Sequence, residues 1–592
     1  MTLTDYVYSK NKYRLDLPAL RYLGKSITYE ELFDKIDQTA RCFRKLGVNE
    51  GDNVALALPL IPEVIYMIYG LDRIGASANL IDPRVPSERM NYYINLTQTK
   101  LAVVISSYMN TMCKAAELSE VTNIVSISPI ASLEPADRIK FMAVHFTKKE
   151  QGIHLREEIG RSVDKFTFNV KHLGKRKVIE YRDFCKEQLP VMQNAKYSRE
   201  KAAIVEYTSG TTGIPKGLEM TACGMNVTAE QISIINKATP GDSILAIMPP
   251  FISYGAVTGI HMSLASGMEM ILVPNFSTEH FAEYIKASKP NNIICVPSMF
   301  GHVIKSSLLE KEDLSYLKRL IFGGDRTTPD FEKEVNDWLH AHNAPATLIK
   351  GGGMAEFSSC CFETPFEETK KPGIYGIPLP LVDAKIMKND HLECGYNEIG
   401  EIYISSPQQM LGYVKNPKET EEFFYTDENG IKWGRSGDLG YVDKDGFFTL
   451  TSRKKQMIIR PDGHNVFPGE IENVIKKSGF VKECVVIGLK DENSVIGEYP
   501  FAFIEFKEPY LSSTDEMLLK IEEHVKKHIP VRDRPADNAY YYGEMIYSSE
   551  GKLDRNAMLL KLQQEVKKKN IGRVYCIDCI RMHYLSRSIH RK

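Results

Sequence analysis

The residues best suited to chemistry form a short loop in the first half of the chain. The segment from Tyr207 to Gly217 reads Tyr-Thr-Ser-Gly-Thr-Thr-Gly-Ile-Pro-Lys-Gly. Glycine lets backbone amides approach an anion closely, and the hydroxyl groups and the lysine add donors and a positive charge. The apolar run from Ala202 to Tyr207 predicts a buried strand that ends at this loop, where α/β sheets bind ligands. The segment therefore indicates a phosphate-binding site.

The loop differs from a Walker A motif, which requires Gly, four residues and then Gly-Lys-Ser/Thr. Counted from Gly210, Lys216 is in place, but Pro215 and Gly217 stand where the second glycine and the hydroxyl residue belong. A flexible surface loop is the other interpretation, because Ser, Thr and Gly are ordinary loop residues. The strand predicted before the loop favours the phosphate site.

Length and composition limit the classes of protein to which the chain can belong. A chain of 592 residues is too long for one core and predicts several domains. Its 75 Lys and Arg balance 76 Asp and Glu, so neither a nucleic acid nor an anionic membrane is expected as the main partner. The 11 cysteines lack the spacing of a disulfide framework or a zinc cluster, which favours reduced thiols and a cytoplasmic location.

No stretch predicts a signal peptide or a transmembrane segment. The N-terminal residues lack a basic stretch followed by an apolar core. The most apolar long window, Val54 to Leu71, is interrupted by Pro59, Pro62 and Glu63 well short of a spanning helix.

Helices and strands alternate along the first part of the chain. Helical spacing of apolar residues predicts helices over Tyr29 to Leu46, after the cap-like Thr28, and over Pro62 to Ile74. The basic segment from Lys165 to Arg182 is expected as a solvated loop. The alternation of helices and strands predicts an α/β class with parallel sheets. The predicted strands are Asn53–Leu58, Ala102–Ile105, Ser243–Ile247, Glu269–Val273, Asn292–Val296 and Arg319–Phe322.

The pattern of predicted elements changes after Gly400. Short strands such as Glu401 to Ser405 predict a β-rich subdomain, and a helix around Ile471 followed by a helix over Thr514 to His528 belongs to a small α+β domain. We expect a large N-terminal domain over residues 1–454, a small mobile C-terminal domain over 455–566 and a basic, disordered tail over 567–592. One Cys576-x-x-Cys579 pair in the tail is only a weak sign of zinc.

Four further stretches lie downstream of the loop, and together with it they resemble a known family. In this order they resemble the core motifs of the adenylate-forming superfamily, which holds acyl-CoA synthetases, luciferases and the adenylation domains of peptide synthetases. The resemblance extends to about Leu562. The stretches read Gly351-Gly-Gly-Met-Ala-Glu356; Trp433-Gly-Arg-Ser-Gly-Asp438; Ser452-Arg453-Lys-Lys455 with Gly463-His-Asn-Val-Phe-Pro-Gly-Glu470; and Gly551-Lys552-Leu-Asp-Arg555.

The resemblance implies an enzyme that uses ATP, Mg²⁺ and coenzyme A. In that superfamily a carboxylic acid attacks the α-phosphorus of ATP, releases pyrophosphate and leaves an acyl-adenylate, whose acyl group a thiol then accepts. Such chemistry needs positioned donors and neutralised charge, which a hydroxyl-rich loop, a metal ion and a lysine supply.

The resemblance also implies the role of each residue. Glu356 matches the Mg²⁺ ligand, Lys552 matches the catalytic lysine of the small domain, and Lys455 matches the hinge about which that domain swings. The expected nucleotide and coenzyme A contacts are Thr208, Ser209, Gly210, Thr211, Thr212 and Lys216 at the phosphates, Gly324 in the nucleotide site, Asp438 and Arg453 at the ribose, and Gly463 beside pantetheine.

The motifs depart from the superfamily pattern at several positions. Gly352 stands where an aromatic residue usually stacks on adenine, and Ala355 stands where a threonine usually precedes the glutamate. Ser452 replaces the usual glycine, and Gln456 replaces the usual aspartate. Lost nucleotide contacts leave open a ligase-like binding protein without turnover.

The motifs do not specify the acid. No aspartate lies between Pro249 and Gly255 to pair with a substrate ammonium, which argues against an α-amino acid. We expect an AMP-forming ligase that joins a medium- or long-chain fatty acid to coenzyme A, with an aryl acid or an acyl carrier protein as alternatives. The residues expected to line an alkyl pocket, unless they are plain core, are Ile252, Tyr254, Val257, Ile260 and Met299.

Overall fold

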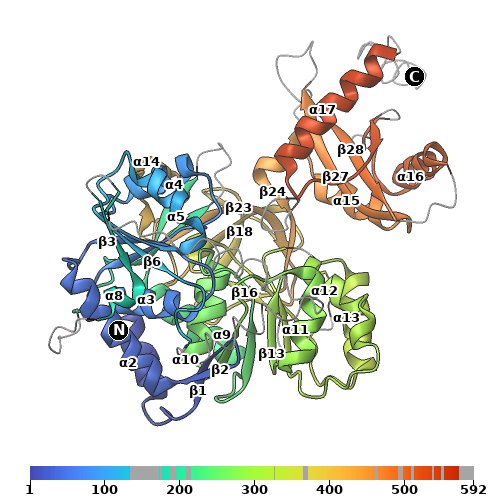
Figure 1. Ribbon diagram of the computed structural model, residues 1–592. Coiled ribbons are helices and arrows are strands. Elements are labelled where there is room, and N and C mark those ends of the chain that lie inside the picture. The colour runs from blue at the N-terminus through green and yellow to red at the C-terminus, as the bar shows by residue number, and fades with distance from the viewer. Residues whose placement is uncertain are drawn as a thin grey trace, which may run out of the picture. The chain divides into compact units, whose positions relative to one another are not determined.

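Contacts divide the chain into two units. Unit 1 comprises Met1–Ala384 and Tyr403–Arg435, and unit 2 comprises Lys385–Ile402 and Ser436–Lys592. Figure 1 shows their helices and strands. The computed structural model describes residues 1–133, 172–173, 176–186, 195–208, 215–325, 327–364, 371, 373–460, 465–490, 498–507, 513–531, 533–536, 539–547 and 553–572.

The first sheet of unit 1 has the order β17-β16-β15-β14-β13-β11-β12-β1-β2. Its central strands β12, β11, β13, β14 and β15 run parallel, as the alternating pattern predicts. The N-terminal hairpin extends the sheet because β1 pairs with β12. The strands are β1 (Pro18–Tyr22), β2 (Lys25–Thr28), β11 (Ser243–Ala246), β12 (Glu269–Leu272), β13 (Asn292–Cys295), β14 (Arg319–Phe322), β15 (Leu348–Gly352), β16 (Phe362–Glu363) and β17 (Ile377–Pro378).

The second sheet of unit 1 has the order β21-β10-β9-β4-β3-β5-β6-β8-β7. Strands from β9 to β8 in this order run parallel, whereas β10 returns antiparallel beside β9. The strands are β3 (Asn53–Ala57), β4 (Ser77–Leu80), β5 (Leu101–Ile105), β6 (Asn123–Ile127), β7 (His172–Leu173), β8 (Arg176–Glu180), β9 (Ala202–Thr208), β10 (Lys216–Thr221) and β21 (Gly412–Tyr413).

The prediction of a solvated loop in the basic segment is wrong for its described part. Strand β8 contains Arg176 and Lys177 and pairs with β6. Charged residues are common near a sheet edge, where they discourage further strand pairing. A run of basic residues therefore did not exclude a strand.

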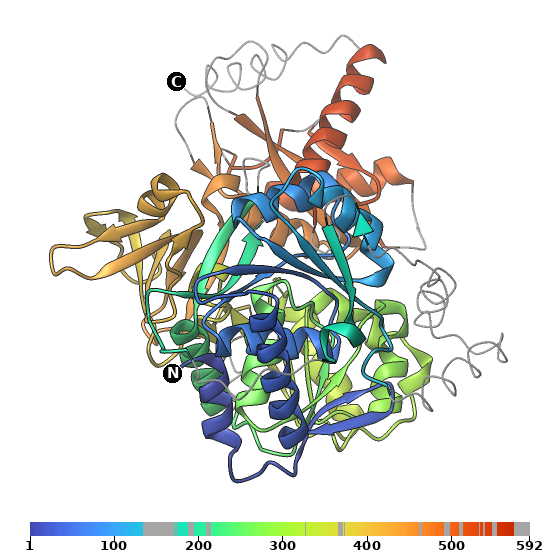
Figure 2. The ribbon, with the colours of Figure 1, turned by 60° about the vertical axis from the view of Figure 1, so that its left-hand side comes forward.

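Helices of unit 1 follow local signals. Thr28 caps α2 in a reciprocal capping box with Glu31, and Pro62 stands in the first turn of α3. Helices α2 and α3 pack together, and so do α1, α9 and α10 (Figure 2). The helices are α1 (Leu3–Asn11), α2 (Tyr29–Lys45), α3 (Pro62–Arg73), α4 (Ser87–Leu96), α5 (Met109–Ala116), α8 (Tyr181–Phe184), α9 (Ala222–Ile235), α10 (Met262–Ala265), α11 (Phe281–Ser288), α12 (Pro297–Ile304), α13 (Pro329–Ala341) and α14 (Pro417–Phe423).

Unit 2 contains an α+β body with its own apolar core. Strand β27 pairs antiparallel with β28, which pairs parallel with β29. Ile471, Ile475, Ile521 and Val525 from the two helices α15 and α16 belong to one buried cluster with this sheet. The elements are α15 (Pro468–Lys476), β27 (Val481–Lys490), β28 (Glu498–Phe506), α16 (Thr514–His528), β29 (Tyr540–Tyr542) and α17 (Arg555–Gly572).

Strands before this body complete the β-rich part. They are β18 (Asp383–Asn389), β19 (Leu392–Glu393), β20 (Gly400–Ser405), β22 (Phe424–Thr426), β23 (Lys432–Val442) and β24 (Phe448–Arg453). These sheets and helices confirm the predicted α/β class with a small C-terminal α+β part.

Two predicted boundaries differ from the observed elements. Contacts group β24 with unit 2, and β24 pairs with β23. The prediction instead places all residues up to 454 in the large N-terminal domain. The hinge at Lys455 stays a prediction. Helix α17 continues to Gly572, so the predicted tail is wrong where it begins at residue 567. Lysine and asparagine extend a helix at small cost, unlike proline. Residues 573–592 lie outside the described part.

Within the described ranges, no helix is both long and apolar enough to cross a membrane. The nine cysteines in those ranges are free thiols. Five of those in unit 1 are buried: Cys42, Cys113, Cys295, Cys360 and Cys361.

Candidate active site

The two ends of the predicted phosphate loop face each other across a hairpin. Thr208 ends β9, Lys216 begins β10, and the two residues are paired in the antiparallel register. The hydroxyl of the adjacent Tyr207 donates to Oδ1 of Asn79 at 2.7 Å, and its ring stacks on Tyr93 with centroids 3.7 Å apart. These two contacts hold Tyr207 at the base of the loop. Ser209, Gly210, Thr211 and Thr212 lie outside the described residues.

The ammonium of Lys216 lies beside an aromatic ring and a carboxylate. Its Nζ is 4.6 Å from the ring centroid of Tyr413 and forms an ion pair with Glu419. Tyr413 reaches this place because β21 pairs with β10. Glu419 lies in the first turn of α14, which Asn416 caps. The pairing of β21 with β10 and the first turn of α14 thus position Lys216, the lysine predicted to bind phosphate.

Glu356 lies in a short 3₁₀ turn, η5 (Ala355–Phe357), four residues after the end of β15. The carboxylate is buried, and its Oε1 accepts a hydrogen bond of 2.8 Å from the Tyr413 hydroxyl. Burial and the neighbouring Glu356 raise the pKa of Tyr413 well above its ordinary value, so the phenol stays a donor. The backbone carbonyl of Glu356 accepts from the Met410 amide at 2.7 Å.

The chemistry of this carboxylate fits Mg²⁺. That ion is commonly held by one or two protein carboxylates together with substrate phosphates, so a single fixed glutamate suffices. Among the described residues no group of three or more His, Cys, Asp or Glu side chains could hold a metal by itself. Glu356 would therefore hold Mg²⁺ jointly with a phosphate-bearing substrate.

The predicted ribose residues lie together in unit 2. Asp438 on β23 is paired with Arg453 on β24, and Arg453 Nε lies 2.7 Å from Asp438 Oδ1. Asp438 is 4 % exposed, whereas the Arg453 side chain is half exposed. Nearby, Glu401 accepts from the Gly437 amide at 3.0 Å and pairs with Lys454 at 2.6 Å. Asp438 thus presents a buried carboxylate beside the Arg453 guanidinium.

Gly324 occupies a left-handed turn two residues after the end of β14. Its φ is +79°, which favours glycine. A Cβ on the preceding Gly323 would lie 2.8 Å from Cζ of Tyr254, so the aromatic ring covers this turn. The Tyr254 hydroxyl donates to the carbonyls of Cys295 and Ile321, each at 3.4 Å. Gly323 was not singled out from the sequence, although it follows a predicted strand.

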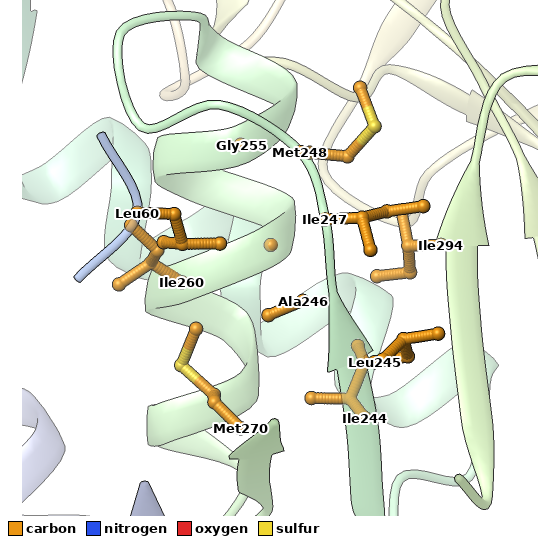
Figure 3. A pocket seen from close by; sticks show the side chains of 11 residues that line it. Leu60, Ile244, Leu245, Ala246, Ile247, Met248, Gly255, Ile260, Met270 and Ile294 are labelled. Atoms are coloured by element: carbon orange, nitrogen blue, oxygen red, sulfur yellow. The ribbon is translucent and has the colours of Figure 1, made fainter. Parts of the chain in front are cut away.

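The residues expected in an alkyl pocket differ in their burial and in the elements that carry them. Tyr254, Val257 and Ile260 belong to η2 (Tyr254–His261), a π-helical segment, and such segments are frequent at functional sites. Val257 and Ile260 are buried, whereas Ile252, Tyr254 and Met299 are half-buried. Figure 3 shows Ile260 at a small apolar cavity. This cavity has room for only about one water-sized sphere, ≈ 10 Å³. Its lining residues are Leu60, Ile244, Leu245, Ala246, Ile247, Met248, Gly255, Gly259, Ile260, Met270 and Ile294.

Gly463 and Lys552 lie outside the described part of the chain, as does the side chain of Lys455. Their roles stay predictions.

Sequence reasoning missed Tyr413 and Glu419. The segment Gly412 to Thr420 contains a signal for a helix start, since Asn416 is a good cap and Pro417 suits the first helical position. That signal locates α14 but does not indicate which strand or loop lies beside it. The contacts with Glu356 and Lys216 depend on chain segments far apart in the sequence.

Comparisons with known proteins agree with the motifs. Residues 8–414 match the family model described as AMP-binding enzyme, and residues 470–540 match the AMP-binding enzyme C-terminal domain. The chain is 27 % identical to a long-chain-fatty-acid–CoA ligase of Bacillus subtilis (strain 168), over 85 % of each chain. It is 29 % identical to a probable 4-coumarate–CoA ligase 3 of Dictyostelium discoideum, over 82 % of each.

A solved structure supports the same fold. The anthranilate CoA ligase AuaEII, in complex with anthranoyl-AMP, matches with a TM-score of 0.77 at 19 % identity, covering 96 % of this chain and 98 % of that chain. The family match spans more than half of the chain. The chain therefore belongs to the AMP-binding enzyme family, as its motifs predicted.

Proposed function

We propose that this protein is an AMP-forming acyl-CoA ligase, which activates an apolar carboxylic acid with ATP and transfers the acyl group to coenzyme A. The observation that carries the proposal is the convergence of Lys216 and Glu356 on Tyr413. A cation and a metal-binding carboxylate, held by one side chain at the base of a glycine-rich loop, suit a triphosphate.

The described residues would have separate tasks in adenylate formation. Thr208 and Lys216 would hold the β- and γ-phosphates from the two ends of the hairpin, and Tyr413 would orient Glu356. Mg²⁺, when bound through Glu356, supplies neutralisation of phosphate charge. Asp438 would accept hydrogen bonds from the ribose hydroxyls, with Arg453 holding its carboxylate.

The roles of the remaining residues rest on the motifs. We assign Lys552 to stabilisation of charge as the carboxylate meets the α-phosphorus, and Gly463 to passage of pantetheine in the second step. The small domain, residues 455–566, would swing about Lys455 between the two steps. The expected compartment is the cytoplasm.

A medium- or long-chain fatty acid is the acid we favour. The long-chain-fatty-acid–CoA ligase of Bacillus subtilis supports it, as do the apolar residues Val257 and Ile260. An aryl acid is the second candidate, because the Tyr254 ring occupies the turn at Gly323. A 4-coumarate–CoA ligase relative also favours it.

A screen of pyrophosphate release tests the proposal. Purified protein, ATP and Mg²⁺ would be mixed with acids from acetate to oleate, and with benzoate and coumarate, each with and without coenzyme A. We expect release with one class of acid, and acyl-CoA and AMP only when coenzyme A is present. Glu356→Gln, which keeps the shape of the side chain but removes its charge, should abolish release.

Two outcomes would contradict the proposal. ATP binding without pyrophosphate release for every acid would favour a ligase-like binding protein. Adenylate formation without transfer to coenzyme A, but with transfer to a phosphopantetheine-bearing carrier protein, would show that the acceptor is the carrier protein and not coenzyme A.

A further inference from the structure

The ring of Tyr375 lies against the backbone of Gly352. A Cβ placed on Gly352 would be 2.0 Å from Cε2, 2.3 Å from Cζ and 2.7 Å from Cδ2 of Tyr375. No side chain other than the hydrogen of glycine therefore fits at the last residue of β15 while Tyr375 stays in place. The strand lacks an aromatic side chain here, and a neighbouring segment provides one.

Strand pairing brings Tyr375 to this position. Gly352 is paired with Phe362 on β16, and Phe362 is paired with Pro378 on β17, the strand that follows Tyr375. The rings of Phe362 and Tyr375 are 5.0 Å apart at 36°. Gly376 has φ of +130°, and a Cβ there would lie 2.7 Å from the backbone of Glu363. A glycine after Tyr375 thus lets its segment pass close to β16.

Two charged side chains hold the backbone on the other side of Tyr375. Nζ of Lys350 donates to the Ile374 carbonyl at 2.9 Å and pairs with Glu332 at 2.7 Å. The amide of Gly373 donates to Oε2 of Glu332 at 3.2 Å. Both charged side chains are largely buried, at 12 % and 9 % exposure. The segment that carries Tyr375 is therefore fixed by an ion pair as well as by strand pairing.

The Tyr375 ring lies at the carboxyl end of β15, where a ligand is expected. Strand β15 is parallel to β14, and ligands of such sheets bind at the carboxyl ends of the strands. Gly352 is at that end, and Glu356 follows in the next turn. Tyr375 is half-buried. Aromatic rings stack on planar ligand rings, and the planar group that ATP brings is adenine.

We propose that Tyr375 provides the aromatic surface for the adenine ring of ATP, in place of the side chain that Gly352 lacks. This rests on the proposed function and deepens it by assigning a residue that contacts the base of the nucleotide. The loss of an aromatic residue at Gly352 then does not remove base stacking from the protein.

Binding of the fluorescent analogue 1,N⁶-ethenoadenosine triphosphate to the full chain tests the proposal without requiring turnover. Stacking on an aromatic ring quenches the emission of this base. We expect quenching in the wild type and in Tyr375→Phe, and none in Tyr375→Leu. Tyr375→Leu should weaken ATP binding roughly 5- to 150-fold, the range for loss of one base–aromatic stack. Its affinity for inorganic pyrophosphate, which has no base, should stay unchanged.

Tyr316→Leu is the matched control, because Tyr316 is a half-buried tyrosine in the loop before β14. It should bind ATP as the wild type does. A second test moves the ring back to β15: Gly352→Tyr alone should lose ATP binding through the clash with Tyr375, and Gly352→Tyr with Tyr375→Ala should recover it. A folded double variant that fails to recover binding would overturn the proposal.

Other outcomes separate this proposal from the function on which it rests. Equal loss of ATP and pyrophosphate binding in Tyr375→Leu, or persistent quenching, would show that Tyr375 only fills space, and would overturn the inference alone. A wild type that binds and quenches the analogue but releases no pyrophosphate with any acid would support the inference and contradict the ligase. A wild type that binds no ATP would overturn both.

Discussion

The hydroxyl of Tyr413 donates a hydrogen bond of 2.8 Å to Oε1 of Glu356, although the two residues are 57 positions apart. The same ring lies 4.6 Å from Nζ of Lys216. One tyrosine therefore contacts both the candidate metal ligand and the candidate phosphate lysine. Tyr413 is therefore a positioning residue. Its loss should lower the use of ATP more than it lowers the free energy of unfolding.

Tyr413→Phe should lower kcat/KM for ATP. The change keeps the ring beside Lys216 but removes the donor to a buried carboxylate, and hydrogen bonds to charged groups contribute about 1.5–3 kcal/mol, or roughly 10- to 150-fold. Pyrophosphate release measured against ATP and Mg²⁺ concentration checks this. Tyr22→Phe is the control, because Tyr22 donates to the Pro129 carbonyl away from Glu356. An equal fall in both variants would contradict a specific role.

Glu419→Gln should tighten ATP binding. Glu419 and the phosphates of ATP are anions that compete for Lys216, and a partly exposed ion pair is worth up to about 1 kcal/mol, which is about fivefold. The effect should shrink as salt is added, because salt screens exposed charges. Calorimetric titration with ATP at two salt concentrations measures it.

Glu422→Gln on the same helix is the control for that experiment, since Glu422 pairs with the exposed Lys418 rather than with Lys216. Weaker ATP binding in Glu419→Gln would show that Glu419 holds Lys216 in place for the phosphates instead of competing with them.

Lys552→Ala should slow adenylate formation by on the order of a hundredfold or more, the usual cost of losing a preorganised charge donor. Thioester formation from a supplied acyl-adenylate should be spared, because that step is expected in another orientation of the small domain. The two half-reactions would be measured separately, with Lys561→Ala as a control from α17. Equal slowing of both steps would contradict the two-orientation mechanism.

Glu363→Gln should make the free energy of unfolding less dependent on pH. Burial raises the pKa of Glu363 to about 8, although Asn236 donates to Oε1 at 2.8 Å and partly opposes the shift. Between the ordinary carboxyl pKa of about 4.3 and this value, the folded protein keeps a proton that the unfolded chain releases. The stability from this group therefore falls as pH rises, by up to about 1.4 kcal/mol per pH unit.

Chemical denaturation at pH 5, 6.5 and 8 measures this effect. The advantage of Glu363→Gln over the wild type should grow steadily across the series. Glu334→Gln, a change at an exposed position on α13, should show no such trend. A constant difference between Glu363→Gln and the wild type would show that the buried carboxyl does not titrate in this range.

Local signals in the sequence predicted much of the fold. Helix α16 has the predicted bounds, Thr514 to His528, and α2 begins at the predicted cap Thr28. The strands β11 and β14 lie within or at their predicted ranges. Helical periodicity, caps and short apolar runs act over a few residues, so they can be recognised without knowing what packs against them.

Tertiary structure decided the contacts between these elements. That Lys216 meets Glu419, that Glu356 meets Tyr413, and that the ring of Tyr375 covers Gly352 depends on which strands pair and in which register. The sequence determined the family and the residue types that could hold ATP, including the glycine at position 352. It could not determine which side chain fills the space above that glycine, because close packing joins residues distant along the chain, and only the folded sheet brings them together.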